Sequence, residues 1–127
     1  YWPVFRCRSL AGFGCPPRQL DDRYQRNQRW AKVSLQRRPS EYMRANWYFT
    51  FVQDHYGVRN REAIGVERCL WSTDYPHHGC DWPHSRRVVD GMFAGVPPAD
   101  RDRITFGNCV GLYGLRLSEN LLSATAA

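Results

Sequence analysis

The chain has 127 residues, of which 43% are hydrophobic and 14% aromatic, a composition typical of one globular domain. Its net charge is +6, but the arginines are scattered and mostly adjoin acidic residues, so no nucleic-acid partner is expected. No apolar run approaches the roughly 18 residues of a membrane span, and Arg6 and Arg8 argue against a signal peptide, so no membrane partner is expected. Five widely spaced cysteines, an odd number, favour reduced thiols in a cytoplasmic protein.

Taken in chain order, the pattern alternates helices and strands after an irregular start. Residues 1–16 show neither helical nor strand periodicity and are expected to be irregular. Apolar spacing and Pro-led starts predict helices at 17–33, 39–46, 58–64, from Asp81 or Pro83 to Ala94, and at 97–113. Aromatic and β-branched residues predict strands at 47–52 and 67–72, which we expect to be parallel neighbours joined by the helix at 58–64 in a right-handed crossover. The small, polar residues 118–127 predict a flexible tail.

Two parallel strands cannot form a stable sheet by themselves, because both edges stay open. The sequence therefore indicates part of a larger sheet, and the absence of an initiator Met suggests a fragment. Trp47, Phe49 and Phe51 belong to the first predicted strand, and an open edge near them is expected to promote association.

Asp74 lies two residues after the second predicted strand, where burial should still be substantial. A buried carboxylate is costly unless an arginine, backbone N–H groups or a metal ion pairs with it, and the residues alone leave these open. His77 and His78 in the next loop either line a pocket or lie on the surface. A separate zinc site made of Cys69, Cys80 and two histidines is disfavoured, because no Cys-x-x-Cys pair exists.

Several motifs resemble one known family. They are Arg-Pro-Ser-Glu-Tyr-Met-Arg-Ala-Asn-Trp-Tyr-Phe-Thr-Phe at 38–51, Ser-Thr-Asp-Tyr-Pro-His at 72–77, Trp82-Pro83 opening a helix, and Asn-Cys-Val-Gly-Leu-Tyr-Gly-Leu at 108–115. Together they resemble the C-terminal quarter to third of the amidohydrolase-related family. These are metal-dependent TIM-barrel hydrolases and non-oxidative decarboxylases, such as aminocarboxymuconate-semialdehyde decarboxylase. The resemblance covers roughly residues 17–115 and is strongest over 39–115.

The resemblance implies an α/β fold in which residues 17–117 are the C-terminal part of a (β/α)8 barrel, with its seventh and eighth strands at 47–52 and 67–72. It places Asp74 at the catalytic, metal-binding carboxylate that exchanges a proton with metal-bound water and substrate, with zinc as the expected metal. The family's other ligands are a His-x-His pair on the first strand and histidines after strands five and six. They have no counterpart here, because all four histidines (His55, His77, His78 and His84) lie at or beyond strand seven.

The resulting functional expectation is a truncated metal-dependent hydrolase or non-oxidative decarboxylase acting on a small carboxylated or ring substrate. As this chain alone it is expected to be inactive, while a full-length parent could form homo-oligomers. Asp74 is the expected catalytic and metal residue, with His77 and His78 as candidates for the substrate pocket. The alternative is a small basic binding or interaction module without catalysis.

Overall fold

The computed structural model of the chain describes residues 4–6 and 17–116. Its sheet has three parallel strands in the order β1-β2-β3, namely β1 (Val4–Arg6), β2 (Tyr48–Phe51) and β3 (Cys69–Trp71). Between β2 and β3 the register pairs Phe49 with Cys69 and Phe51 with Trp71. The prediction of two parallel, neighbouring strands in these stretches is confirmed.

The strand β1 corrects the expectation that residues 1–16 are irregular. Val4–Arg6 pairs in parallel with Tyr48–Thr50 at the other edge of β2. This strand could not be recognised in the sequence, because three residues are too few to display an alternating pattern and the strand is defined by backbone pairing. The rest of that segment and the predicted tail at 118–127 lie outside the described residues.

The helices lie close to their predicted positions. They are α1 (Pro17–Ala31), α2 (Pro39–Asn46), α3 (His55–Arg59), α4 (Arg61–Ile64), the 3-10 turn η2 (Val66–Arg68), α5 (Ser85–Met92), α6 (Pro98–Asp102), the π-helical turn η3 (Arg103–Gly107) and α7 (Asn108–Tyr113). Gly65, with φ 108°, ends α4, and Gly114, with φ 59°, ends α7, conformations that glycine adopts readily. None of the helices described could cross a membrane.

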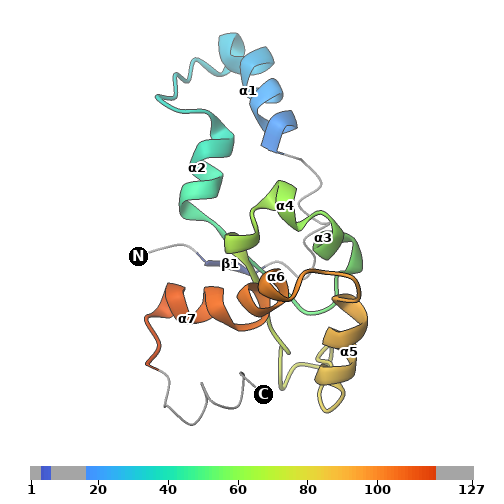
Figure 1. Cartoon of the computed structure of the whole chain (residues 1–127). Coiled ribbons are helices and arrows are strands. Elements are labelled where there is room, and N and C mark those ends of the chain that lie inside the picture. The colour runs from blue at the N-terminus through green and yellow to red at the C-terminus, as the bar shows by residue number, and fades with distance from the viewer. Residues whose placement is uncertain (1–3, 7–16, 117–127) are drawn as a thin grey trace.

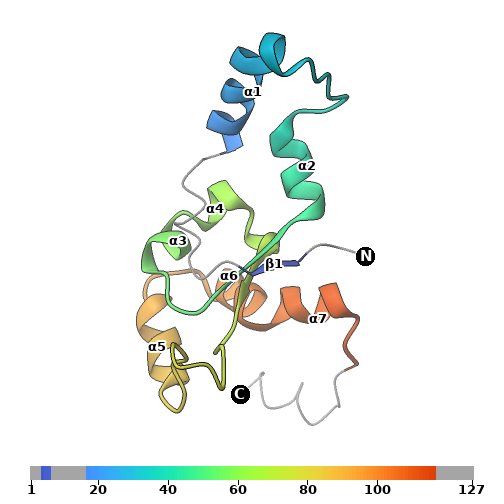
Figure 2. The ribbon, with the colours of Figure 1, turned by 180° about the vertical axis from the view of Figure 1, so that it is seen from behind.

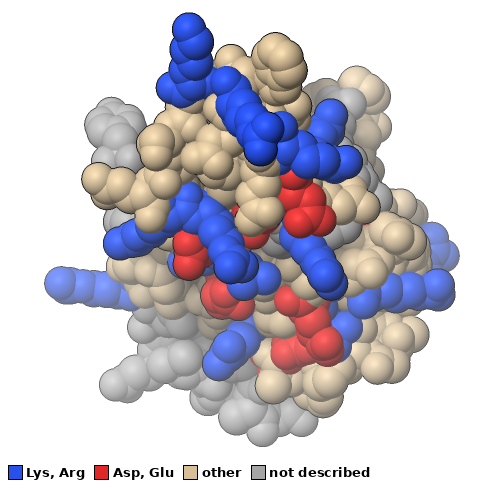
Figure 3. Space-filling view, turned by 90° about the horizontal axis from the view of Figure 1, so that it is seen from above, with Lys and Arg blue, Asp and Glu red and all other residues tan. Residues whose placement is uncertain are grey.

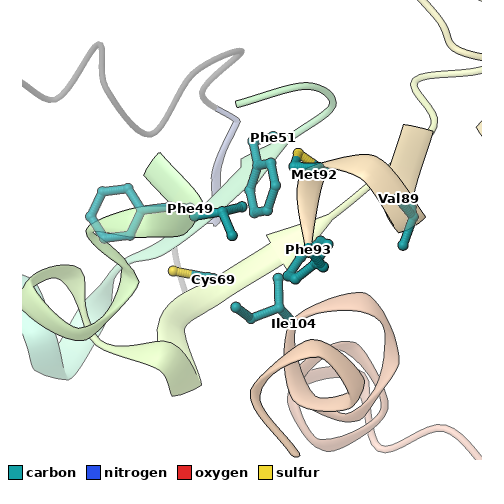
Figure 4. Packing of buried hydrophobic residues seen from close by; sticks show 8 residues of the cluster. Phe49, Phe51, Cys69, Val89, Met92, Phe93 and Ile104 are labelled. Atoms are coloured by element: carbon teal, nitrogen blue, oxygen red, sulfur yellow. The ribbon is translucent and has the colours of Figure 1, made fainter. Parts of the chain in front are cut away.

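The hydrophobic core lies between the sheet and the C-terminal helices (Figure 4). Its buried members are Phe49, Phe51, Val58, Cys69, Val89, Met92, Phe93 and Ile104. Phe49 and Phe51 are two residues apart on β2, so they share one face of the sheet and are 2% and 0% exposed. Both therefore face the core, and association of the chain through an open sheet edge stays a prediction.

Polar contacts connect the C-terminal helices to the crossover between β2 and β3. The amide nitrogen of Asn108 donates to the carbonyl oxygens of Val66, at 2.7 Å, and Cys69, at 2.9 Å. The buried guanidinium of Arg61 lies 2.7 Å from the Asp100 carboxylate. Buried charges are tolerated when paired in this way. These contacts fix the start of β3, and with it the segment that continues into Asp74.

The helices α1 and α2 form a hairpin, residues 17–46, here called the arm, which projects from the rest of the chain (Figures 1 and 2). The Asp21 carboxylate closes it by accepting hydrogen bonds from the Ser40 backbone N–H, at 2.9 Å, and hydroxyl, at 2.6 Å. Burial alone would raise the pKa of Asp21, but these hydrogen bonds and the nearby Arg38 and Arg44 outweigh it and lower the pKa. The arm is thus held together by its own contacts.

Candidate active site

Asp74 lies just beyond the carboxyl end of β3, as predicted, and is 9% exposed. Its backbone is left-handed, with φ 58°, a conformation that aspartate tolerates better than most residues. The Asp74 N–H donates to the Ser72 hydroxyl at 3.2 Å, and the Asp74 carbonyl accepts from the His77 N–H at 2.8 Å. These local bonds fold the chain back at the end of the strand and hold the carboxylate in place.

A hollow of about 290 Å³ opens beside Asp74. Its lining comprises Val52, Gln53, Asp74, His77 and Gly79. Val52 and Gln53 directly follow β2, and Asp74 follows β3, so the hollow lies where two parallel strands end. In barrels of alternating strands and helices, functional groups gather at this end of the strands. The geometry therefore gives Asp74 access to a small bound molecule.

His77 lies in this hollow beside the Asp74 carboxylate. Its Nδ1 is 3.5 Å from Asp74 Oδ2 and accepts a hydrogen bond from the Gly79 N–H at 3.2 Å. In the neutral ring this acceptor role places the proton on Nε2, while a protonated ring could donate to Asp74 instead. The carboxylate and the imidazole thus form a polar pair at the wall of the hollow.

His78 is placed differently from its neighbour. It is exposed, its ring centroid is 4.0 Å from that of His77, and it is not among the described residues that line the hollow. Of the two histidines predicted for the pocket, His77 therefore lines the hollow, while the exposed His78 packs its ring beside that of His77.

The alternative zinc site of Cys69, His77, Cys80 and His84 is not formed. Cys69 is fully buried in β3, and its thiol donates to the Gly65 carbonyl at 3.4 Å. Burial raises the pKa of this thiol to about 12, with a smaller contribution from Glu67. Because a thiolate is the form that binds zinc or attacks an electrophile, Cys69 is a core residue.

We expect the Cys69 thiol of the folded chain to resist alkylation at pH 8, because it is protonated and inaccessible. Cys80 and Cys109 are partly exposed and free, and they serve as internal controls that should react first. Labelling with iodoacetamide followed by peptide mass spectrometry measures the order. Labelling of Cys69 as fast as Cys80 would contradict the burial described here.

The same raised pKa sets a pH dependence of stability. Below pH 9.0, the unshifted pKa of this thiol, the contribution of Cys69 is fully present. As pH rises towards the folded-state pKa of about 12, the unfolded chain ionises first and the free energy of unfolding falls. A Cys69→Val variant should lack this alkaline loss in urea titrations.

The resemblance found in the sequence implies a divalent metal, and Asp74 supplies one carboxylate of the kind such ions bind. Zinc sites use three or four protein ligands. Within residues 4–6 and 17–116, no group of three or more His, Cys, Asp or Glu side chains could hold a metal ion. This part of the chain therefore does not make a complete metal site, and no step through a metal follows from it.

Sequence reasoning missed Gln53, which lines the hollow together with Asp74. The signal was available, because Gln53 follows the first predicted strand as Asp74 follows the second, and the same rule on strand ends applies to both. The ends of β2 and β3 are also joined by a hydrogen bond, in which the indole N–H of Trp71 donates to the Val52 carbonyl at 3.1 Å.

Comparison with known proteins defines the class. Residues 11–115 match the family model described as Amidohydrolase, so the chain belongs to the amidohydrolase family. A comparison with curated protein sequences found no match.

Two solved structures share the fold. One is 5-carboxyvanillate decarboxylase from Sphingomonas paucimobilis, 23% identical with a TM-score of 0.70 over 85% of this chain and 33% of that one. The other is a dihydroxybenzoic acid decarboxylase from Polaromonas sp. with bound manganese and the inhibitor 2-nitroresorcinol. It is 24% identical with a TM-score of 0.56, over 89% of this chain and 34% of that one. The chain thus spans about a third of these relatives, and the predicted fold class, part of a (β/α)8 barrel, is confirmed.

Proposed function

We propose that the chain supplies the C-terminal third of the barrel of a metal-dependent decarboxylase or hydrolase, with Asp74 as its catalytic carboxylate. The observation that carries this proposal is the position of Asp74, buried at the carboxyl end of β3 and lining the hollow with His77. A carboxylate there can hold and transfer a proton, a contribution on the order of 10²–10⁴ in rate.

We favour decarboxylation of a small hydroxylated aromatic acid. The names of both solved relatives specify such a substrate. In this reaction the bond between the ring carbon and the carboxylate breaks, carbon dioxide leaves, and the remaining electron pair takes a proton. In this proposal Asp74 delivers that proton, and His77 and Gln53, which line the same hollow, contact the polar groups of the ring. The competing reaction is hydrolysis of a small ring compound.

The proposed cofactor is a divalent ion. Manganese is present in the Polaromonas structure, whereas the sequence resemblance favours zinc. Its remaining ligands would come from outside the residues described here. We further propose a cytoplasmic location, supported by the free thiols of Cys69, Cys80 and Cys109.

The 127-residue chain alone is expected to bind neither zinc nor manganese stoichiometrically and to show no decarboxylase or hydrolase turnover. The reason is that Asp74 needs further protein ligands to hold an ion. Metal content after dialysis, measured by mass spectrometry together with circular dichroism to verify folding, checks this. One equivalent of metal retained by the wild type but not by Asp74→Asn would contradict it and would identify a site within this chain.

A further inference from the structure

The net positive charge of the chain is concentrated in the arm. From Arg23 to Ser40 there are six basic residues and no acidic one, while the other twelve basic residues are balanced by twelve acidic ones. The six are Arg23, Arg26, Arg29, Lys32, Arg37 and Arg38. This corrects the impression from the whole sequence that the arginines mostly adjoin acids. Residues 23–40 of the arm thus carry a charge equal to the whole net charge of the chain, and the charges of the other residues cancel.

The far end of the arm, residues 29–38, also exposes apolar side chains. This arm tip holds the end of α1 and the loop that leads to α2 (Figures 1 and 2). Trp30 is 85% exposed, Val33 47% and Leu35 38%. Apolar side chains gathered on a surface and surrounded by polar ones are typical of docking sites.

Hydrogen bonds from Tyr24 on α1 hold the loop of the arm tip in place. The Tyr24 hydroxyl donates to the Val33 carbonyl at 3.2 Å and accepts from the Leu35 N–H at 2.7 Å. These bonds fix the backbone of the loop. On α1, Arg23, Arg26 and Trp30 follow i, i+3, i+7 spacing and so share one face of the helix. Figure 3, which looks down on this end of the molecule, shows Lys and Arg side chains over much of this face, with uncharged surface and some Asp and Glu side chains between them.

We propose that the arm tip docks onto an anionic phospholipid membrane surface. Trp30, Val33 and Leu35 would enter the interface between headgroups and acyl chains, where an indole ring is favoured. Arg29, Lys32 and Arg37 would lie at the level of the acidic headgroups, whose charge is complementary to theirs. The sequence expectation of no membrane partner rested on the lack of a spanning segment, and docking at the surface requires none.

A nucleic acid is the competing partner, because arginines bind phosphates and a base can stack on an indole. A nucleic acid offers Val33 and Leu35 only base faces and sugar edges, however, whereas a bilayer interface offers hydrocarbon to both aliphatic side chains beside its charged headgroups. The exposed side chains of Val33 and Leu35 therefore favour a membrane surface over a nucleic acid. The proposal is independent of Asp74 and the hollow.

The test is co-sedimentation of the full 127-residue chain with phosphatidylcholine vesicles, with and without phosphatidylserine, and with a vesicle-free sample to detect self-association. Binding is expected only when phosphatidylserine is present. Each charge near an anionic bilayer strengthens binding about five-fold, so an Arg29→Gln, Arg37→Gln double variant should bind about 25-fold more weakly. Trp30→Ala should weaken binding about ten-fold, and a Val33→Ser, Leu35→Ser variant should also weaken it.

The control variants carry matched changes elsewhere on the surface. Arg86→Gln with Arg87→Gln removes two exposed charges from α5, and Tyr113→Ala removes an aromatic side chain that is 57% exposed on α7. Both should bind like the wild type. Absence of binding, equal binding to pure phosphatidylcholine, or equal loss in the controls would each overturn the proposal. Tighter binding to a single-stranded oligonucleotide, unaffected by the serine substitutions, would assign the arm to nucleic acid instead.

Discussion

Asp74→Asn should lower kcat by at least about two orders of magnitude in a protein that joins this sequence to the rest of the barrel. The fold should persist, because asparagine is nearly isosteric and tolerates the left-handed backbone at this position, where φ is 58°. The amide cannot hold the transferred proton and is a weaker ligand for a divalent ion. Steady-state turnover of a hydroxylated aromatic acid, measured beside circular dichroism and metal content, gives the result.

Asp90→Asn is the matched control, because Asp90 is an exposed carboxylate that pairs with Arg101 away from the hollow. Its turnover should equal that of the wild type. If Asp74→Asn retained near wild-type kcat, Asp74 would be a structural residue of the loop. A loss of activity accompanied by loss of folded protein would instead reflect stability, which is why both are measured on the same sample.

Phe51→Ala should lower the free energy of unfolding by about 3–5 kcal/mol, the range for a large aromatic side chain removed from a core. Phe51 is 0% exposed and belongs to the cluster with Met92 and Phe93, so its loss leaves a cavity between β2 and α5. Single domains are stable by only about 5–15 kcal/mol, so a large fraction of the total would be lost. Urea unfolding followed by circular dichroism measures the change.

Two further variants separate cavity formation from other causes. Phe51→Leu keeps the site apolar and leaves a smaller void, so it should cost less than Phe51→Ala. Tyr113→Ala removes an exposed ring and should change stability by no more than about 0.5 kcal/mol. A loss below about 1 kcal/mol for Phe51→Ala would show that the core around β2 is not as closely packed as described.

The elements with strong local signals could be predicted from the sequence. The aromatic and β-branched run at 47–52 and the buried run at 67–72 specified β2 and β3, because side chains of this kind favour a buried sheet. Prolines at 39 and 98 marked the starts of α2 and α6. The strand β1 could not be predicted, because pairing of three residues depends on a partner far along the chain.

Two features of the candidate site could be predicted from the sequence, namely Asp74 and its location at the carboxyl ends of the strands. The position of Asp74 could be predicted because it comes after a strand. The different positions of His77 and His78 could not be predicted, because the directions of adjacent side chains in a turn depend on backbone angles that residue spacing does not specify. Only His77 faces the hollow. Gln53 was overlooked although it could have been predicted, because it follows the first predicted strand and functional residues gather at strand ends.

The order of the strands has a consequence for how the chain folds. The paired residues Phe51 and Trp71 are separated in the sequence by only one crossover, whereas the whole arm separates Val4 from its partner Tyr48. Bringing distant segments together costs more chain entropy, so contacts of long sequence separation form slowly. During synthesis β1 therefore emerges long before its partner, and the arm is complete before β2 appears. We expect β2 and β3 to form the nucleus, with β1 added last.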